Sequence, residues 1–370
     1  MNPIYVPILA AKQGEFSALL NLQSTVSGRI MPLFNVPNPG NEKSLEDAIA
    51  KSAVKTGKAW SGREAFLDIV KWKPNARTES GIHVLEFAFS QFRSQGVTVH
   101  PVVAYDRWDD HEYSQALKNI RASHSVMFCI RLDSEAIEDM GDLPYFADRM
   151  NQIMSELDVS TDNCYVLIDL GDVSKSAMPD VLANAETAID ATRSLGFGTV
   201  ILAGSSMPAS INEAVGTPDA AGCIPRIEMM VWKAIFAERN DRSIIFGDYA
   251  IRNPNAADGI IAQHSNAKIR YTINNQFFIV RGHSKQLTRI GMQSKELAKI
   301  LVASQHYMGP TFSWGDAQIL GCSIGTKEIG SLTTWIGIDS NHHIQTIVAE
   351  IYEYQQQVAP ISVPVQGDFV

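Results

Sequence analysis

The sequence predicts an α/β fold, a (β/α)8 TIM-like barrel with a C-terminal extension (a hairpin plus helices) near the barrel mouth. The prediction rests on a repeated pattern in which a short apolar run ends at a polar residue and a helix-like stretch follows. A parallel strand covered on both faces reads as a continuous apolar run of this kind. The eight runs are residues 8–11, 32–34, 66–67, 102–104, 128–130, 166–168, 201–203 and 244–247. Eight such strands alternating with helices make a (β/α)8 barrel, whose chemistry sits at the carboxyl ends of the strands.

The segments between these runs support the barrel. Seven of them carry apolar residues at helical spacing, namely 14–22, 43–55, 81–93, 112–121, 143–157, 179–195 and 224–237. Gly96 and Gly196 stand just after two of these segments, as C-terminal helix caps do. Parallel strands need such crossovers, which are almost always right-handed, so few other topologies remain. The main alternative is a doubly wound open sheet, but residues 10–14 do not form the glycine-rich turn that usually follows its first strand.

The alternation of apolar runs and helix-like segments stops after residue 250. The barrel core is expected over residues 1–250, because such barrels take about 250 residues. Residues 251–370 would close and extend it within one integrated domain. They begin with a predicted hairpin, 268–281, around Asn274 and Asn275. Residues 295–307 are predicted as the eighth barrel helix, which would place the hairpin over the mouth. Trp314 begins a short helix, and His342 begins the last one, 342–354.

Composition excludes several classes of protein. A net charge of −9 over 370 residues argues against a general affinity for nucleic-acid phosphates. The four cysteines are scattered singly without a CxxC motif, which favours reduced core thiols. The first residues lack the basic and apolar regions of a signal peptide, and no window of 18 apolar residues predicts a membrane span. We therefore expect a soluble cytoplasmic protein.

The strand ends hold the best candidates for chemistry. Lys12, Asp68, Arg131, Asp169 and Asp248 each follow or end one of the apolar runs, so two cations and three anions should converge on one mouth. Such charges shift one another's pKa values. The three aspartates are candidate catalytic residues, as acid and base or as nucleophile and acid, and with a divalent cation they could orient a phosphate. In the alternative reading, the charges pair with one another and plug the barrel.

A second set of residues suggests an anion site. Arg226 and Ser205 belong to the region after the seventh strand, where barrels often bind phosphate. Glu228 lies in the first turn of a predicted helix, where it complements the helix dipole. Arg270 and Arg281 on the hairpin could clamp an anion from above, although strand alternation turns some hairpin side chains away.

The two adjacent histidines give a weaker signal. On a helix, His342 and His343 point about 100° apart, so their spacing does not favour chelation of one metal. Capping, or packing against Trp314 or Trp335, is the expected role. No metal site and no cofactor are predicted, although a divalent cation is compatible with the aspartates.

Several short motifs occur together along almost the whole chain. They are Tyr5-Val-Pro-Ile-Leu followed by Lys12-Gln-Gly-Glu15, Arg29-Ile-Met-Pro-Leu-Phe, Pro225-Arg-Ile-Glu228, Phe246-Gly-Asp-Tyr249, Arg270-Tyr-Thr, Arg281-Gly, Trp314-Gly-Asp and Asn341-His-His-Ile344. In this combination the sequence resembles the phage-associated Beta protein family. Members of that family occur on phages, satellites and bacterial mobile elements, and one is linked to a neighbouring killing protein in anti-phage defence. The resemblance implies a defence or toxin-restraint context and supplies no reaction.

The motif residues coincide with the predicted strand ends and mouth elements. They are Lys12, Arg226, Glu228, Asp248, Tyr249, Arg270 and Arg281. This coincidence favours a ligand site over a plug.

Three hypotheses about function stay open. The preferred one is a phage-defence-associated protein whose charged mouth binds a small anionic or nucleotide-like ligand, or docks a toxin or effector protein. The second is a hydrolase or phosphodiesterase-like enzyme that uses the strand-end carboxylates. The third is a purely structural antitoxin-like partner without pocket chemistry. The fold cannot choose between them, because this barrel supports many unrelated activities.

Overall fold

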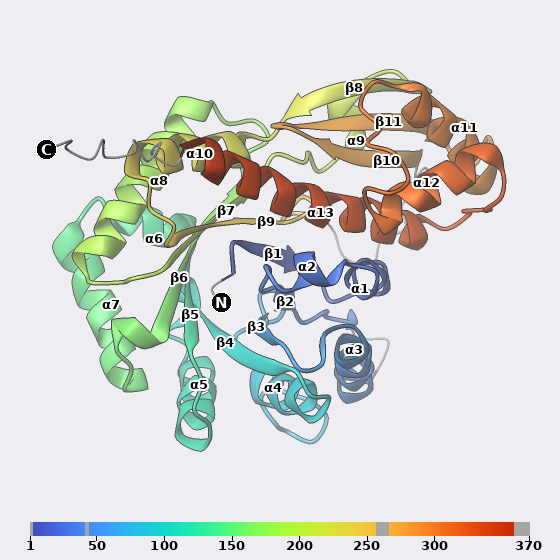
Figure 1. The fold of residues 1–370 in the computed structure, drawn as a ribbon. Helices are drawn as coiled ribbons and strands as arrows, with labels where there is room; N and C mark the ends of the chain where they lie inside the picture. Colours follow the sequence, from blue (N-terminus) through green and yellow to red (C-terminus); the bar gives the residue numbers. More distant parts are fainter. Residues whose placement is uncertain (1–2, 41–43, 257–265, 359–370) are drawn as a thin grey trace, which may run out of the picture.

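A closed barrel of eight parallel strands forms the centre of the protein (Figure 1). The computed structural model describes residues 3–40, 44–256 and 266–358. The strands are β1 (Tyr5–Leu9), β2 (Leu33–Asn35), β3 (Glu64–Asp68), β4 (Thr98–Ala104), β5 (Phe128–Leu132), β6 (Cys164–Asp172), β7 (Val200–Ser205) and β9 (Ile244–Asp248). They follow one another around the barrel in this order, and β9 pairs with β1 to close it. The (β/α)8 prediction is confirmed, and each of the eight predicted apolar runs overlaps one of these strands.

Helices cover the outside of the barrel, as the apolar stripes predicted. They are α1 (Gln13–Leu20), α3 (Leu45–Trp60), α4 (Val84–Ser94), α5 (His111–Ser123), α7 (Leu143–Leu157), α8 (Met178–Ser194) and α10 (Ile227–Arg239). Shorter helical segments lie between them: α2 (Ser24–Ser27), η2 (Tyr105–Arg107), α6 (Ser134–Asp139), η3 (Thr161–Asn163) and α9 (Ile211–Ala214). Outward strand residues and the helices form one large buried cluster.

Side chains fill the inside of the barrel. The interior cluster takes every second residue of a strand, for example Val6 and Ile8 of β1, or Leu167 of β6. Because successive strand residues point to opposite faces, the polar residues two positions further along also point inward, above this apolar plug. The barrel therefore has a packed core with a polar mouth at its carboxyl end.

The eighth barrel helix is not the predicted one. Residues 295–307 overlap α11 (Ile290–Ala303), which packs against α12 (Trp314–Ile324) and the hairpin, away from the barrel core. The long helix α13 (Leu332–Val358) takes the eighth place, because it contacts α1 and β1 and its Ile347 and Ile351 join the barrel cluster. It begins ten residues before the predicted start at His342. Neither α13 nor any other helix in the described parts of the chain is long and apolar enough to cross a membrane.

A small antiparallel sheet extends the barrel on one side (Figure 1). Its hairpin is the predicted one, with β10 (Asn266–Ile273) and β11 (Gln276–Ser284). Its third strand, β8 (Ala220–Pro225), pairs with β11, so the helix predicted over 224–237 begins only at Ile227. The sheet, α11, α12 and the first half of α13 enclose a second core, which includes Leu297 and Ile338.

Helix α13 should be essential for the stability of the barrel. Replacing Ile347 with Ala removes a fully buried side chain from the barrel core. We expect a loss of about 2–5 kcal/mol in the free energy of unfolding, measured by urea denaturation. The matched control is Tyr352→Ala on the same helix, where the side chain is 52% exposed. Equal stability of the two variants would contradict the placement of α13 in the barrel wall.

Candidate functional site

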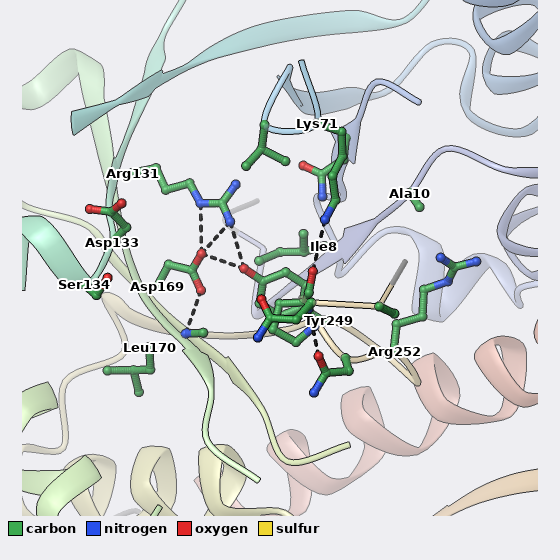
Figure 2. Close-up of a pocket in the computed structure, with 17 residues that line it drawn as sticks. Ile8, Ala10, Lys71, Arg131, Asp133, Ser134, Asp169, Leu170, Tyr249 and Arg252 are labelled. Atoms are coloured by element: carbon green, nitrogen blue, oxygen red, sulfur yellow. Dashed lines mark hydrogen bonds and ion pairs between the residues drawn. The ribbon is translucent and has the colours of Figure 1, made fainter. Parts of the chain in front are cut away.

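A cavity of about 260 Å³ opens at the carboxyl ends of the strands (Figure 2). Its floor is formed by inward-pointing residues at the strand ends, including Asn35 of β2, Arg131 of β5 and Asp169 of β6. Tyr249, the residue after β9, completes the floor. The walls come from the end of β6 and from residues that follow β1, β3, β5 and β9. The cavity therefore lies where the fold places the functional sites of such barrels.

Arg131 is the centre of the floor. Its Nε and Nη2 donate to Oδ2 of Asp169 at 2.9 and 2.5 Å, and its Nη1 donates to Oδ2 of Asp68 at 2.6 Å. Nη2 also lies 2.8 Å from the hydroxyl of Tyr249, which itself donates to Asp169 at 2.6 Å. Figure 2 shows Arg131, Asp169 and Tyr249 converging. Three strand ends are thus tied together by one guanidinium.

This network fixes the charge state of the floor. Burial by itself would lower the pKa of Arg131, but Tyr249, Asp169 and Asp68 outweigh it and raise that pKa well above its usual value. Burial also raises the pKa of Tyr249 well above its usual value, so its hydroxyl stays protonated and donates. Two carboxylates against one guanidinium leave the floor with a formal charge of −1. It therefore favours a positive or hydrogen-bond-donating group.

The floor also holds acceptors that lack a donor. Oδ1 of Asn35 and Oδ1 of Asp68 are buried, and no hydrogen bond reaches either atom among the described residues. The two residues face each other in the register of β2 and β3. Buried polar atoms without a partner are rare in folded proteins, and each calls for an explanation. Of the two residues, Asn35 lines the cavity.

Cations lie on the rim, above the strand ends. Nζ of Lys71, in the loop after β3, donates to the carbonyl oxygen of Pro254 at 3.1 Å. Arg252, in the loop after β9, pairs with Glu15 of α1, their Nε and Oε1 atoms being 3.2 Å apart. The Ser205 hydroxyl fixes the same loop by donating to the carbonyl of Arg252 at 2.8 Å.

A further arginine holds the loop after β3 in place. Arg107 lies in η2, and its guanidinium donates to the carbonyl oxygens of Ile69, Val70 and Trp72 at 2.8–3.2 Å. On the other side of the rim, Nδ2 of Asn253 donates to Oδ2 of Asp172 at 2.7 Å. Because hydrogen bonds hold these loops from several directions, the cavity is largely formed before any ligand enters.

Asp248 does not line the cavity. Strand alternation turns it outward from β9, between the inward Gly247 and Tyr249 positions. Its Oδ1 accepts from the Tyr5 hydroxyl at 2.6 Å, and its Oδ2 lies 2.9 Å from Nε2 of His343 on α13. Burial opposes ionisation, but His343 and the other donors outweigh it and keep the pKa of Asp248 below its usual value. The contacts of this carboxylate are structural.

The Arg226 region is also separate from the cavity. Arg226 is fully buried and pairs with Glu350 of α13, and its guanidinium lies over the ring of Phe277. Glu228 is buried beside it and accepts a hydrogen bond from Ser206. Burial raises the pKa of Glu228 to about 7. None of these groups lines the mouth cavity.

The remaining predicted residues lie elsewhere. Lys12 lines a second depression, of about 440 Å³, together with Lys51 and Lys55. Arg270 pairs with Asp339 of α13, its Nε being 3.0 Å from Oδ2. Nη1 of Arg281 donates to two backbone carbonyl oxygens, those of residues 215 and 216. The hairpin accordingly supplies no residue to the mouth cavity.

The two histidines belong to the buried interface of α13. His342 lies 2.9 Å from the carboxylate of Asp316, and Nδ1 of His343 lies 2.7 Å from the hydroxyl of Thr272. Within the described ranges, no group of three or more His, Cys, Asp or Glu side chains is arranged to hold a metal ion.

The mouth cavity thus contains three of the residues singled out from the sequence: Arg131, Asp169 and Tyr249. Asp68 contacts the cluster from below, through Arg131. The sequence reasoning missed Asn35 as a site residue, although it ends the second apolar run. It also missed Lys71 and Arg252, three and four residues past their strands. The position of these residues in the loops just after strand ends could have identified them as candidates.

Comparison with known families agrees with the fold. The model of a family described as Beta protein matches residues 5–349. The chain belongs to the Beta protein family. The match includes every barrel strand as well as the hairpin and most of α13, so the extension is part of the family pattern. No curated protein matches the sequence.

The Arg131 network gives a stability prediction. Arg131→Met leaves the buried carboxylates of Asp68 and Asp169 without their cation, so we expect a loss of about 3–5 kcal/mol in unfolding free energy. Adding Asp68→Asn and Asp169→Asn removes the stranded charges and should recover most of that loss. Chemical denaturation of the two variants and wild type measures the difference. A triple variant no more stable than the single one would refute the charge argument.

Glu228 gives a pH prediction. The unfolded pKa of a glutamate is about 4.3, and burial raises that of Glu228 to about 7 in the fold. Between these values the folded protein holds a proton that the unfolded chain has lost. Stability should therefore fall as pH rises through this window. Glu228→Gln should flatten this fall in denaturation curves, whereas the exposed Glu238→Gln on the same helix should leave it unchanged.

Proposed function

We propose that this protein binds a small ligand bearing an anionic group in the mouth of its barrel. The observation that carries the proposal is the cavity itself, with its charged floor of Arg131, Asp169 and Tyr249 held rigid by mutual hydrogen bonds. A pre-formed concave site with a few convergent polar groups is typical of small-molecule binding. Its volume of about 260 Å³ suits a metabolite no larger than a small nucleotide fragment.

The anionic group of this ligand would bind at the rim. Lys71 and Arg252 stand there on the two loops that flank the opening. The floor suits an anion less well, because most donors of Arg131 already bind Asp68, Asp169 and Tyr249. The residues that support anion binding are therefore the cations on the loops, and not the strand-end residues predicted from the sequence.

The wider role of the protein is also a proposal. Membership of the Beta protein family supports a function in phage defence or toxin restraint in the cytoplasm, where ligand occupancy would govern action on a toxin or effector protein. In this scheme the ligand is the signal, and the protein partner receives it through another surface.

Ligand binding can be tested with a thermal-shift screen against nucleotides, sugar phosphates and divalent metals. A ligand that binds only the folded state raises the melting temperature in proportion to its occupancy. Ser134→Trp, which fills the cavity from its wall, should abolish a shift of several degrees. Ser94→Trp, at the exposed end of α4, is the matched control and should retain it. A shift that survives in Ser134→Trp would move the ligand out of the mouth.

A further inference from the structure

The floor and the rim of the mouth cavity differ in charge. Asn35, Arg131 and Asp169 lie within strands and form the floor, whereas Lys71 and Arg252 lie in loops beyond the strand ends. In Figure 2 the Arg131 and Asp169 pair lies apart from the guanidinium of Arg252, with Tyr249 between them. A ligand that spans the cavity therefore meets two different environments.

The deep part of the cavity is negative. Asp68 and Asp169 outnumber Arg131 there, and Asp133 on the adjoining wall adds a third carboxylate. Asp133 caps α6 by accepting a hydrogen bond from the backbone N–H of Ala136 at 3.3 Å, so its carboxylate is held at the wall of the cavity. A purely anionic ligand would be repelled by these groups, since only one guanidinium opposes three carboxylates.

The deep part also needs a donor. Asn35 is 7% exposed and lines the cavity, and its Oδ1 receives no hydrogen bond among the described residues. A bound group with N–H or O–H donors would satisfy this oxygen and would be attracted by the negative floor. An ammonium group meets both requirements.

The rim, in contrast, is suited to an anion. The Lys71 ammonium has three N–H donors, and its bond to the carbonyl of Pro254 uses one of them. Arg252 lies on the adjoining loop, where Glu15 and Ser205 fix its position. A carboxylate or phosphate group at the rim would make charge-assisted hydrogen bonds to Lys71 and gain from the charge of Arg252.

We infer that the mouth binds a small zwitterion, with its ammonium group on the floor beside Asn35 and Asp169 and its carboxylate or phosphate at the rim beside Lys71. This inference rests on the proposed ligand-binding function and specifies the ligand class. Amino acids and phosphorylated amines belong to this class, and their size suits the cavity.

A series of probes of increasing length tests the inference. The straight-chain ω-amino acids from glycine to 6-aminohexanoate vary the separation of the two charges, and phosphoethanolamine supplies the phosphate version. The matched single-charge probes are butanoate, butylamine, ethyl phosphate and ethanolamine. Titration calorimetry or ligand-observed NMR on the full chain gives each Kd. We expect one zwitterion to bind about tenfold or more tightly than its single-charge analogues, as two charge-assisted contacts require.

Two variants locate the two ends of the ligand. Lys71→Met removes the rim cation, and Asn35→Leu removes the floor acceptor without breaking any hydrogen bond of its side chain oxygen. Each should weaken zwitterion binding about tenfold. Lys71→Met should equally weaken ethyl phosphate, whereas Asn35→Leu should leave it unchanged. Lys58→Met, an exposed lysine at the end of α3, is the control and should change nothing.

The outcomes separate the inference from the proposed function. If ethyl phosphate or butanoate binds as tightly as any zwitterion, and Asn35→Leu has no effect, the zwitterion inference is wrong while ligand binding in the mouth stands. If no zwitterion binds but a nucleotide or sugar phosphate does so in the thermal-shift screen, the conclusion is the same. If no probe binds in either experiment, both the inference and the proposed function fail.

Discussion

The closure of the barrel depends on one buried carboxylate. Asp248, at the end of β9, binds the hydroxyl of Tyr5 on β1 and the imidazole of His343 on α13. His343 in turn contacts Thr272 on the hairpin. The first strand, the last strand, the closing helix and the extension therefore meet around the Asp248–His343 pair. Because a buried charge must be paired, this contact adds a polar tie to the apolar packing that holds α13 against the barrel.

The two-residue period of a strand decides which acidic residues can meet a ligand. Asp68 and Asp169 follow inward residues by two positions and point into the barrel, whereas Asp248 lies one position off and points into the helical layer. Of the two inward carboxylates, Asp169 lines the cavity and Asp68 lies beneath Arg131. The same spacing brings Arg131 between the two inward carboxylates. The polar layer above the apolar plug thus results from the alternation of side chains along each strand. Its net charge is set by the residues at the inward positions of that layer.

The sequence predicted the barrel well because the signal for each strand is local. An apolar run followed by a polar residue requires only neighbouring positions, and all eight runs overlap barrel strands. The eighth helix could not be found in this way, since 290–303 and 332–358 are both amphipathic and only tertiary contacts distinguish them. Strand β8 was missed because Ala-Ala-Gly-Cys has little β propensity, and it pairs through β11. For the site, the sequence indicated which polar residues stand at the strand ends. It did not indicate whether the side chain of Asp248 points into the barrel or away from it.

The ion pairing of the two floor carboxylates, Asp68 and Asp169, with Arg131 bears on the choice between binding and hydrolysis. A general acid or base needs a carboxyl group that can exchange a proton with the substrate within hydrogen-bond reach. Asp169 accepts from Arg131 and Tyr249 through one oxygen and from the backbone of Gly171 through the other. Asp68 lies beneath the guanidinium with 1% exposure. Proton transfer at either group would break a buried ion pair, at a cost of several kcal/mol. A site that only binds a charged ligand needs no proton transfer. The loops above the floor, which hydrogen bonds hold in place, are suited to such binding. This argument supports the proposed ligand binding over the hydrolase hypothesis.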